Sequence, residues 1–388
     1  MLVARSKRKS WKEGTSLPRH DELRVIISGG GTGGHIFPAV SIAKALKEAD
    51  SSTEILFVGA EGRMEMEKVP AAGFKIVGLP IRGIQRSLSV SNLTLPWKVL
   101  QSLLKARKII REFRPDVAVG VGGYASGPLL FMATRMGIPA LIQEQNSFAG
   151  LTNRWLAKRV NKICVAYEGM EKYFPSDKIL LTGNPVRPDI QYIEGKRAEA
   201  LQFFGLSPDK PVLLAIGGSL GARTINETLE NDLERLAGAK VQLIWQTGKS
   251  FFSRAQACAK QFEQQGIKAF DFIARMDLAY AAADLVVSRA GASSVSELTL
   301  TGKAAILVPS PNVAEDHQTK NAMALVKHDA AVLVRDQDAR ESLVREALTL
   351  LSDGERRRLL SERIAVLALP DAAKRIAAEV KSIASKGS

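Results

Sequence analysis

The chain has 388 residues, 46% of them hydrophobic and 24% charged, and its formal net charge is +14 from 54 basic and 40 acidic side chains. This length suits two domains, the composition is that of a soluble globular protein, and no apolar run approaches the roughly 20 residues of a transmembrane helix. The basic excess favours an anionic partner, and the absence of an aromatic-interleaved basic strand favours a phosphorylated substrate or an acidic membrane over nucleic acid. Cys164 and Cys258 lie far apart with no disulfide or zinc spacing, which favours a reducing cytoplasm.

The chain begins with a basic segment, residues 1–21, that lacks the apolar core of a secretory signal, so we expect a disordered extension. A short apolar strand over 23–27 follows, then a glycine loop over 28–35 and a helix over 38–49, with Pro38 in its first turn. The loop satisfies G-x-G-x-x-G only weakly, because so many of its residues are glycine, but a helix N-terminus behind it suits a phosphate. His35 is either a structural histidine or a candidate base at this strand end.

The rest of the first half alternates strands with helices. The expected strands cover 54–59, 75–79, 116–121, 139–142, 162–166 and 179–181, and the expected helices cover 62–72, 96–114, 129–136 and 151–157. The stretch 81–114 mixes basic and apolar residues, which fits either a core helix with a solvated basic face or a membrane-facing patch. A second glycine loop lies at 122–128, and four polar residues, 143–146, end a strand on the ligand face. Asn184-Pro185 marks the crossing to a second domain.

The pattern then restarts, with a third glycine loop at 217–222. The expected strands cover 211–216, 241–246, 267–272, 284–287 and 304–308, and the expected helices of this half include 222–235, 252–265, 340–351, 353–368 and 371–385. We therefore predict an α/β protein of two doubly wound, Rossmann-like parallel sheets facing a cleft. The expected division is an extension at 1–21, an N-terminal domain at 22–184, a C-terminal domain at 185–369, and a last helix at 370–388 packing back on the first domain.

The stretch 288–322 is a strand–loop–helix–strand unit whose loop of small residues, 290–294, lies at the carboxyl end of a strand, where open α/β sheets bind ligands. Small residues let the backbone approach an anion at the N-terminus of the following helix. Glu297 either caps that helix in its first turn or accepts hydrogen bonds from sugar hydroxyls. The polar run 316–321 follows the second strand. Together these features indicate a nucleotide-sugar pocket.

Several other chemistries find no support in the sequence. The four histidines, at 20, 35, 317 and 328, share no helical face that could ligate a metal. The acidic run 336–338 is interpreted as a surface turn or cap, and neither a serine-hydrolase elbow nor an NTPase phosphate loop occurs. A nucleoside diphosphate leaving without a metal needs N–H groups and cations, which the glycine loops and Arg187 and Arg289 could supply.

Seven ordered motifs between about residue 24 and residue 380 resemble those of the MurG family of glycosyltransferases. They are 29–35 (GGGTGGH), 122–128 (GGYASGP), 143–153 (QEQNSFAGLTN), 183–187 (GNPVR), 217–222 (GGSLGA), 289–297 (RAGASSVSE) and 316–321 (DHQTKN). The resemblance implies the GT-B fold and an inverting, metal-independent transfer of N-acetylglucosamine from UDP-GlcNAc to the C4 hydroxyl of the MurNAc of lipid I, which gives lipid II for peptidoglycan synthesis. It implies that the N-terminal domain is the acceptor and membrane-facing domain and that the C-terminal domain binds UDP-GlcNAc. It also implies no cofactor, a peripheral place on the cytoplasmic face of the bacterial membrane with its anionic surface, and other cell-wall synthesis proteins as partners.

The resemblance also implies residue roles. His35 would be the base, Glu144 and Tyr124 would line the acceptor side, and Glu297 would bind the ribose rather than cap its helix. The Ile273 backbone would meet the uracil. Arg289 and Asn321 would lie on the acceptor side or just behind the site. The other donor-binding positions would be Thr32, Gly33, Gly34, Asn146, Arg187, Ser219, Ala292, Ser293, Ser294, Val295, Ser296, His317 and Gln318. The sequence departs from the family pattern in the basic extension and at Gln143, where histidine is frequent.

Two alternatives remain open from the sequence. One is another UDP-sugar enzyme on the same fold, such as a glycolipid synthase or a 2-epimerase, which would share the donor site and differ in its acceptor loops. The other is a dinucleotide-dependent oxidoreductase, with Glu61 after the second strand as its ribose acid. The glycine loop at 217–222 argues against the oxidoreductase, because a single cofactor would not require it.

Overall fold

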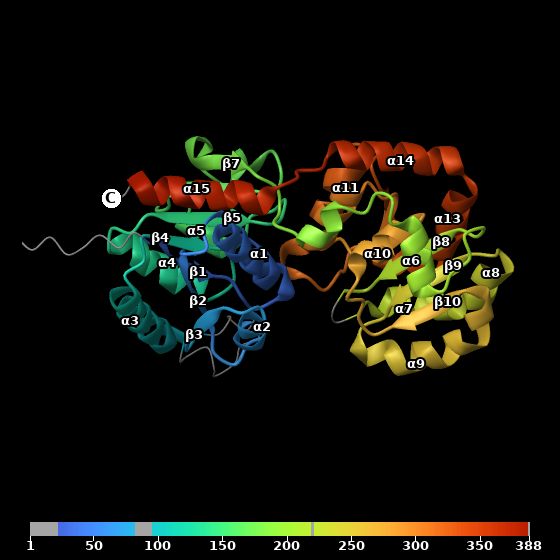
Figure 1. Cartoon of the computed structure of the whole chain (residues 1–388), viewed down its shortest axis with the longest axis horizontal. Helices are drawn as coiled ribbons and strands as arrows, with labels where there is room; N and C mark the ends of the chain where they lie inside the picture. Colours follow the sequence, from blue (N-terminus) through green and yellow to red (C-terminus); the bar gives the residue numbers. More distant parts are fainter. Residues whose placement is uncertain (1–21, 82–94, 219–220, 387–388) are drawn as a thin grey trace, which may run out of the picture.

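The computed structural model describes residues 22–81, 95–218 and 221–386, and it has two α/β lobes side by side (Figure 1). The basic extension, most of the loop after Ile81 with Arg82 and Arg86, and Ser219 of the third glycine loop lie outside the described residues. Within the described part, no helix is long and apolar enough to cross a membrane.

The N-terminal lobe is built on a seven-stranded parallel sheet in the order β3-β2-β1-β4-β5-β6-β7. Its strands are β1 (Arg24–Ser28), β2 (Glu54–Ala60), β3 (Lys75–Leu79), β4 (Val117–Gly120), β5 (Ala140–Glu144), β6 (Lys162–Val165) and β7 (Ile179–Leu181). Its helices are α1 (Gly33–Ala49), α2 (Glu65–Ala71), α3 (Leu95–Phe113), α4 (Ser126–Arg135) and α5 (Leu151–Leu156). The first strand lies in the middle of the sheet, paired with β2 on one side and β4 on the other, so the sheet is doubly wound as predicted.

Helices cover both faces of this sheet, because successive side chains of each strand point to opposite sides. Val25 and Ile27 pack into one apolar core, and Ile26 between them packs into the other. The last helix of the chain, α15 (Ala372–Lys386), lies against α1 and contributes Ile376 and Val380 to the first of these cores. Figure 1 shows α15, in red, lying across the N-terminal lobe.

The C-terminal lobe repeats the plan with a six-stranded parallel sheet in the order β10-β9-β8-β11-β12-β13. Its strands are β8 (Val212–Ile216), β9 (Gln242–Gln246), β10 (Ile267–Phe270), β11 (Leu285–Ser288), β12 (Ala305–Leu307) and β13 (Val332–Leu333). Its helices are α6 (Arg197–Phe204), α7 (Arg223–Asn231), α8 (Leu233–Gly238), α9 (Lys249–Ala259), α10 (Met276–Ala282), α11 (Ala292–Thr301), α12 (His317–Val326), α13 (Ala339–Ser352) and α14 (Gly354–Val366). The predicted class of two parallel α/β sheets is therefore confirmed.

Three helix predictions are wrong in detail. The single helix expected over 222–235 is two helices, because Asp232, with φ −112° and ψ 15°, interrupts it. The first helix begins at Gly33 rather than Pro38, since the Thr32 carbonyl already accepts from the N–H groups of His35 and Ile36 at 3.1 and 3.2 Å. Likewise α11 begins at Ala292. The first turn of α1 starts with two glycines and a histidine, and that of α11 with alanine and two serines, so neither start shows an apolar period and a pattern search places both too late.

Candidate active site

His35 lies in the first turn of α1, where the first glycine loop meets the helix. Its Nδ1 is 3.1 Å from the Gly30 carbonyl oxygen and 3.3 Å from Thr32 Oγ1. A carbonyl oxygen can only accept, so Nδ1 carries the hydrogen and Nε2 keeps a free lone pair. Burial is the main cause that lowers the pKa of His35. The hydrogen bond to the Gly30 carbonyl raises this pKa, and His317 on α12 of the other lobe lowers it. The imidazole is therefore neutral near pH 7, with the tautomer that a general base needs.

The first and second glycine loops pack directly against each other around this histidine. A Cβ on Gly122 would lie 2.7 Å from His35 Cδ2, and a Cβ on Gly123 would lie 2.4 Å from the Gly30 carbonyl oxygen. Both residues also have positive φ, 98° and 89°, which L side chains rarely adopt. Glycine is therefore required twice at this contact. Tyr124, which follows, is 49% exposed.

Glu65 holds the first glycine loop in place, although no sequence motif marks this residue. Its Oε2 accepts from the Gly31 N–H at 2.9 Å and its Oε1 from the Ala60 N–H at 3.0 Å, and the side chain is buried. The acid considered from sequence for a dinucleotide, Glu61, instead forms a half-exposed ion pair with Lys105 at 2.7 Å. The carboxylate that matters to this loop thus lies four residues later, at the start of α2.

Glu297 lies in the second turn of α11, too far from the helix start to cap it. The N-cap is Gly291, with no side-chain cap, so the capping interpretation is wrong. The carboxylate accepts a hydrogen bond from the Tyr280 hydroxyl at 2.9 Å and lies 3.8 Å from Arg187 Nη2. Burial raises the pKa of Glu297, although Arg187 and Tyr280 lower it. A buried carboxylate with one donor and one distant cation has acceptor capacity left for hydroxyl groups of a ligand.

Tyr280, on α10, is the second functional residue that sequence reasoning missed. The side chain is fully buried, and burial raises the pKa of its hydroxyl well above the usual range. It therefore remains a hydrogen-bond donor and fixes one oxygen of Glu297. The segment 279–283 predicts only a short helix, and nothing in its sequence indicates that Tyr280 contacts Glu297.

Arg289 does not offer free positive charge to the cleft, contrary to the sequence-based expectation. Its Nη1 lies 2.5 Å from Asp336 Oδ1 and also donates to the carbonyls of Val308 and Pro309. The second oxygen of Asp336 accepts from Thr224 Oγ1 at 2.9 Å. Arg289 thus ties together the ends of strands in the C-terminal lobe.

Glu144 is turned into its own loop, where both of its carboxylate oxygens accept hydrogen bonds. Its Oε1 accepts from the Asn146 N–H at 3.1 Å, and its Oε2 accepts from the Gly150 N–H at 3.0 Å and Asn153 Nδ2 at 2.9 Å. The residue is buried, and desolvation raises the pKa of Glu144 against these bonds. These bonds shape the loop that presents Asn146, and the expected place of Glu144 on the acceptor side stays a prediction.

Two buried asparagines join the lobes. Asn321 of α12 accepts from the N–H and hydroxyl of Ser147 at 3.0 and 3.1 Å, and donates to Asn146 Oδ1 at 3.1 Å. Asn184 donates to Ser296 Oγ on α11 at 3.0 Å, and its Oδ1 accepts from Gln143 Nε2 at 2.9 Å. The glutamine at 143 therefore supports the lobe junction. Asn321, expected near the acceptor, lies in this junction as well.

The remaining candidates lie on the C-terminal side. Gln318 accepts from the Ser310 N–H at 2.9 Å, and the Ile273 side chain is buried in the lobe core. The first three residues of α11, Ala292, Ser293 and Ser294, carry N–H groups without helical partners, and Val295 and Ser296 follow them. In the described part of the chain no cluster of three or more histidine, cysteine or acidic residues could hold a metal ion.

Comparison with known proteins agrees with this geometry. Residues 25–165 match the glycosyltransferase family 28 N-terminal domain, and residues 212–376 match the glycosyltransferase family 28 C-terminal domain. The chain is 59% identical, over 94% of its own length and 99% of the relative's, to the UDP-N-acetylglucosamine--N-acetylmuramyl-(pentapeptide) pyrophosphoryl-undecaprenol N-acetylglucosamine transferase of Parabacteroides distasonis. It is 56% identical to the protein of the same name from Cytophaga hutchinsonii, covering 95% and 98% of the two chains.

A solved structure extends the comparison to three dimensions. The crystal structure of Acinetobacter baumannii MurG superposes with a TM-score of 0.76 at 27% identity, covering 93% of this chain and 99% of that one. Full-length identity above one half, two matched domains and a shared fold leave one conclusion. The chain belongs to the MurG family of glycosyltransferases.

Proposed function

We propose that this protein transfers N-acetylglucosamine from UDP-GlcNAc to the C4 hydroxyl of the MurNAc of lipid I and so makes lipid II. The observation that carries the proposal is the 59% identity along 94% of the chain to a relative named for this transfer. The site supports it, because a neutral histidine on one lobe faces a lobe whose buried carboxylate and helix N-terminus suit a nucleotide sugar.

The donor would lie on the C-terminal lobe. Glu297, oriented by Tyr280, would accept hydrogen bonds from the ribose hydroxyls, and the Ile273 backbone would meet the uracil. Arg187, the free N–H groups at the start of α11, and Thr32, Gly33 and Gly34 of the other lobe would surround the diphosphate. The family motif adds Ser219 here. Asn146, His317 and Gln318 would face the transferred sugar.

The chemical step follows from His35. As its Nε2 takes the proton, the acceptor oxygen forms a bond to the sugar C1 while the bond from C1 to the diphosphate oxygen breaks on the opposite face, which inverts the anomeric centre. N–H groups and Arg187 would stabilise the negative charge that develops on UDP, and these groups are already in position before the reaction. A positioned base of this kind typically contributes about 10²- to 10⁴-fold to the rate.

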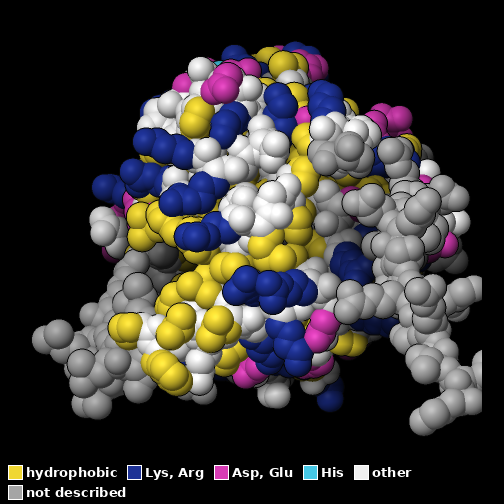
Figure 2. Space-filling model, turned by 90° about the vertical axis from the view of Figure 1, so that its left-hand side faces the viewer, with side chains coloured by type: hydrophobic (Ala, Val, Ile, Leu, Met, Phe, Trp, Pro, Cys, Tyr) yellow, Lys and Arg dark blue, Asp and Glu magenta, His cyan; other side chains and the backbone are white. Residues whose placement is uncertain are grey.

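We also propose that the N-terminal lobe rests on the membrane through α3. Trp97, Leu100 and Leu104 on this helix are 62%, 46% and 58% exposed, beside the exposed Arg107 and Lys108. Figure 2 shows this end of the molecule, where hydrophobic surface is bordered by lysine and arginine. Exposed apolar side chains with basic neighbours suit an anionic leaflet. The peripheral place on the cytoplasmic face would bring the lobe to the lipid acceptor.

The proposed division places an N-terminal domain at 22–184, a C-terminal domain at 185–369 and a closing helix from 370. The strands of the two sheets fall on either side of Asn184, and the chain crosses between lobes again just before α15. Closure about these two crossings would bring the first glycine loop to the donor.

The test is transfer of labelled N-acetylglucosamine from UDP-GlcNAc to a lipid I analogue, with EDTA present. The expected result is a labelled disaccharide lipid. If UDP-GlcNAc bound but no product formed, the acceptor would be wrong while the donor half stood. Activity that needed an added metal would contradict the metal-independent step.

A further inference from the structure

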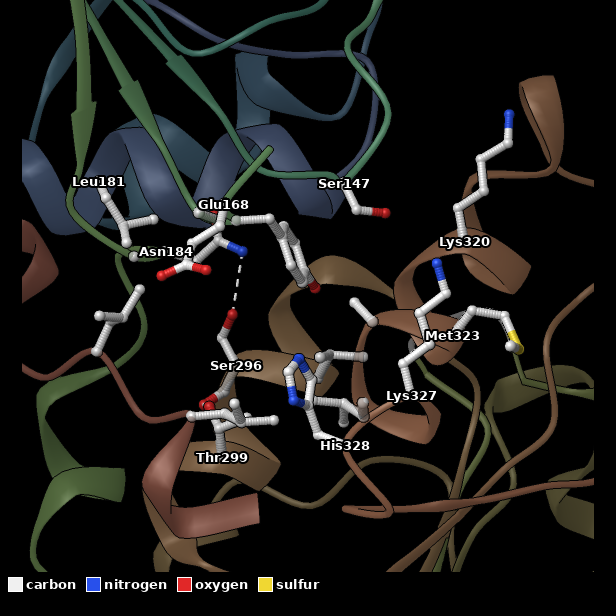
Figure 3. A pocket seen from close by; sticks show the side chains of 18 of the residues that line it. Ser147, Glu168, Leu181, Asn184, Ser296, Thr299, Lys320, Met323, Lys327 and His328 are labelled. Atoms are coloured by element: carbon white, nitrogen blue, oxygen red, sulfur yellow. Dashed lines mark hydrogen bonds between the residues drawn. The ribbon is translucent and has the colours of Figure 1, made fainter. Parts of the chain in front are cut away.

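A cavity of about 660 Å³ lies between the two lobes, beside the candidate active site, and Val295 and Ser296 of α11 line it. Its walls include Leu181 and Asn184 at the first crossing between the lobes, and residues 366–369 at the second. Neither His35 nor Glu297 lines it. Its size is that of pockets that enclose small organic ligands. Figure 3 shows side chains of both lobes converging on it. The cavity therefore lies at the hinge and adjoins the donor site, without including its base or its buried carboxylate.

The lining combines positive charge with apolar surface. Its basic side chains are Lys172, Lys320, Lys327 and His328, and Glu168 is the one carboxylate among the lining residues. Lys320 Nζ donates to the Glu315 carbonyl at 2.7 Å and lies 3.4 Å from the ring centroid of Phe148, so its charge is not cancelled. Lysine and histidine project toward the cavity from the end of α12 (Figure 3). Aromatic and aliphatic side chains form much of the remaining wall, including Phe148, Tyr173, Met323 and Leu325, and neutral polar residues such as Ser147 and Thr299 form the remainder.

The cavity shares two helices with the candidate donor site. On α11, Ser296 and Thr299 line the cavity, while Glu297 between them bonds to Tyr280. On α12, Lys320 and Met323 line it, and His317 and Gln318 begin the same helix on the cleft side. A molecule that shifts these helices at the hinge shifts the donor residues too.

Hydrogen bonds that join the lobes form part of the cavity wall. The bond from Asn184 Nδ2 to Ser296 Oγ, 3.0 Å, crosses from the hinge to α11 and is drawn in Figure 3. Ser147, another lining residue, bonds to Asn321 of α12. The shape of the cavity therefore depends on the relative orientation of the two lobes. A bound molecule that fits one orientation better than another shifts the population toward it.

We propose that this hinge cavity binds a small amphipathic anion, an acidic group on an apolar body, and that its occupancy is coupled to nucleotide binding at Glu297. The lysines and His328 meet the acidic group, and the aromatic wall meets the apolar body. The coupling rests on the proposed function, because it assumes that UDP binds at α11. The binding of the anion to the cavity does not depend on the proposed function.

The first experiment uses 8-anilinonaphthalene-1-sulfonate, an aromatic sulfonate, as the probe, and follows its fluorescence with the full chain. Lys327→Glu/His328→Glu should weaken probe binding at least tenfold. Lys249→Glu, an exposed lysine at the start of α9, is the matched control and should leave it unchanged within twofold. Unchanged binding by the double variant, or equal weakening by the control, would overturn the proposed site.

The second experiment titrates UDP with and without saturating probe. We expect the Kd of UDP to change at least threefold and then level off, with the same factor seen for the probe when UDP saturates, because coupling is reciprocal. If the Kd of UDP rises without limit as probe is added, the probe occupies the nucleotide site itself. If the Kd of UDP does not change, the cavity is not coupled to that site. Either result overturns the proposal. Failure of UDP to bind at all would instead count against the proposed function.

Discussion

Replacing Glu297 by glutamine tests the centre of the donor site with the least change in shape. Glutamine keeps an oxygen for the Tyr280 hydroxyl but loses the negative charge 3.8 Å from Arg187. Hydrogen bonds to a charged acceptor contribute about 1.5–3 kcal/mol and neutral ones about 0.5–1.5. For two ribose hydroxyls the expected loss is about 2 kcal/mol, or about thirtyfold in the Kd of UDP. Isothermal titration calorimetry at neutral pH measures it.

The same variant should not lose stability, and this separates a binding defect from misfolding. The raised pKa of Glu297 means that the folded protein holds its proton more tightly than the unfolded chain does, so stability is lost as pH rises through that pKa. Glutamine resembles the protonated form, so the melting temperature should stay or rise. Glu263→Gln, at an exposed position of the same lobe, is the control. A folded Glu297→Gln protein whose Kd for UDP changed less than twofold would refute the reasoning.

Three further predictions concern the base, the fold and the membrane surface. His35→Ala should spare UDP binding and lower kcat about 10²- to 10⁴-fold, and near-normal turnover of the variant would dismiss His35 as the base. In the wild type, kcat/KM should fall only below pH 6.5 on the acid side, because the lowered pKa of His35 keeps the base neutral down to that pH. Asp277, buried between Arg275 and Lys196, has its pKa lowered to about 2, so its stabilisation is complete above pH 4 and lost toward pH 2. Asp277→Asn should therefore cost about 2 kcal/mol in urea unfolding at pH 7, and a cost that persisted at pH 2 would contradict this. Trp97→Ser/Leu104→Ser should reduce sedimentation with anionic vesicles at least tenfold, whereas Phe203→Ser, an equally exposed residue of the other lobe, should not; equal effects would remove α3 from the membrane surface.

The fold and the family could be predicted from sequence because both are marked by short segments that follow one another in a fixed order along the chain. Buried parallel strands read as short apolar runs, and the glycine loops follow them at fixed places. Of the alternatives considered, the dinucleotide-dependent oxidoreductase is wrong, since the chain belongs to the MurG family. Glu61, on which it relied, only pairs with Lys105 in solvent.

The side chains that orient the site could not be predicted in the same way. Glu65 reaches the first glycine loop from a helix more than 30 positions away, and Tyr280 reaches Glu297 from a helix that looks like core. Arg289 and Glu144 lie in the right motifs, but Asp336 and the loop after β5 engage them. Sequence order reveals which residues gather at a sheet edge. It does not reveal which of them neutralise one another, because that depends on contacts between distant segments.

The return of α15 to the first lobe has a consequence for how the protein is made. Ile376, Val380 and Ile383 complete an apolar core that begins with Val25. On the ribosome most of the N-terminal lobe emerges before the C-terminal lobe, yet part of its core is synthesised only after the whole C-terminal lobe. Domains usually fold as units during synthesis, the first one first. Here the second lobe is fully synthesised before the first can close, and a nascent chain stalled before Ala372 would present an unfinished apolar face beside α1 to chaperones.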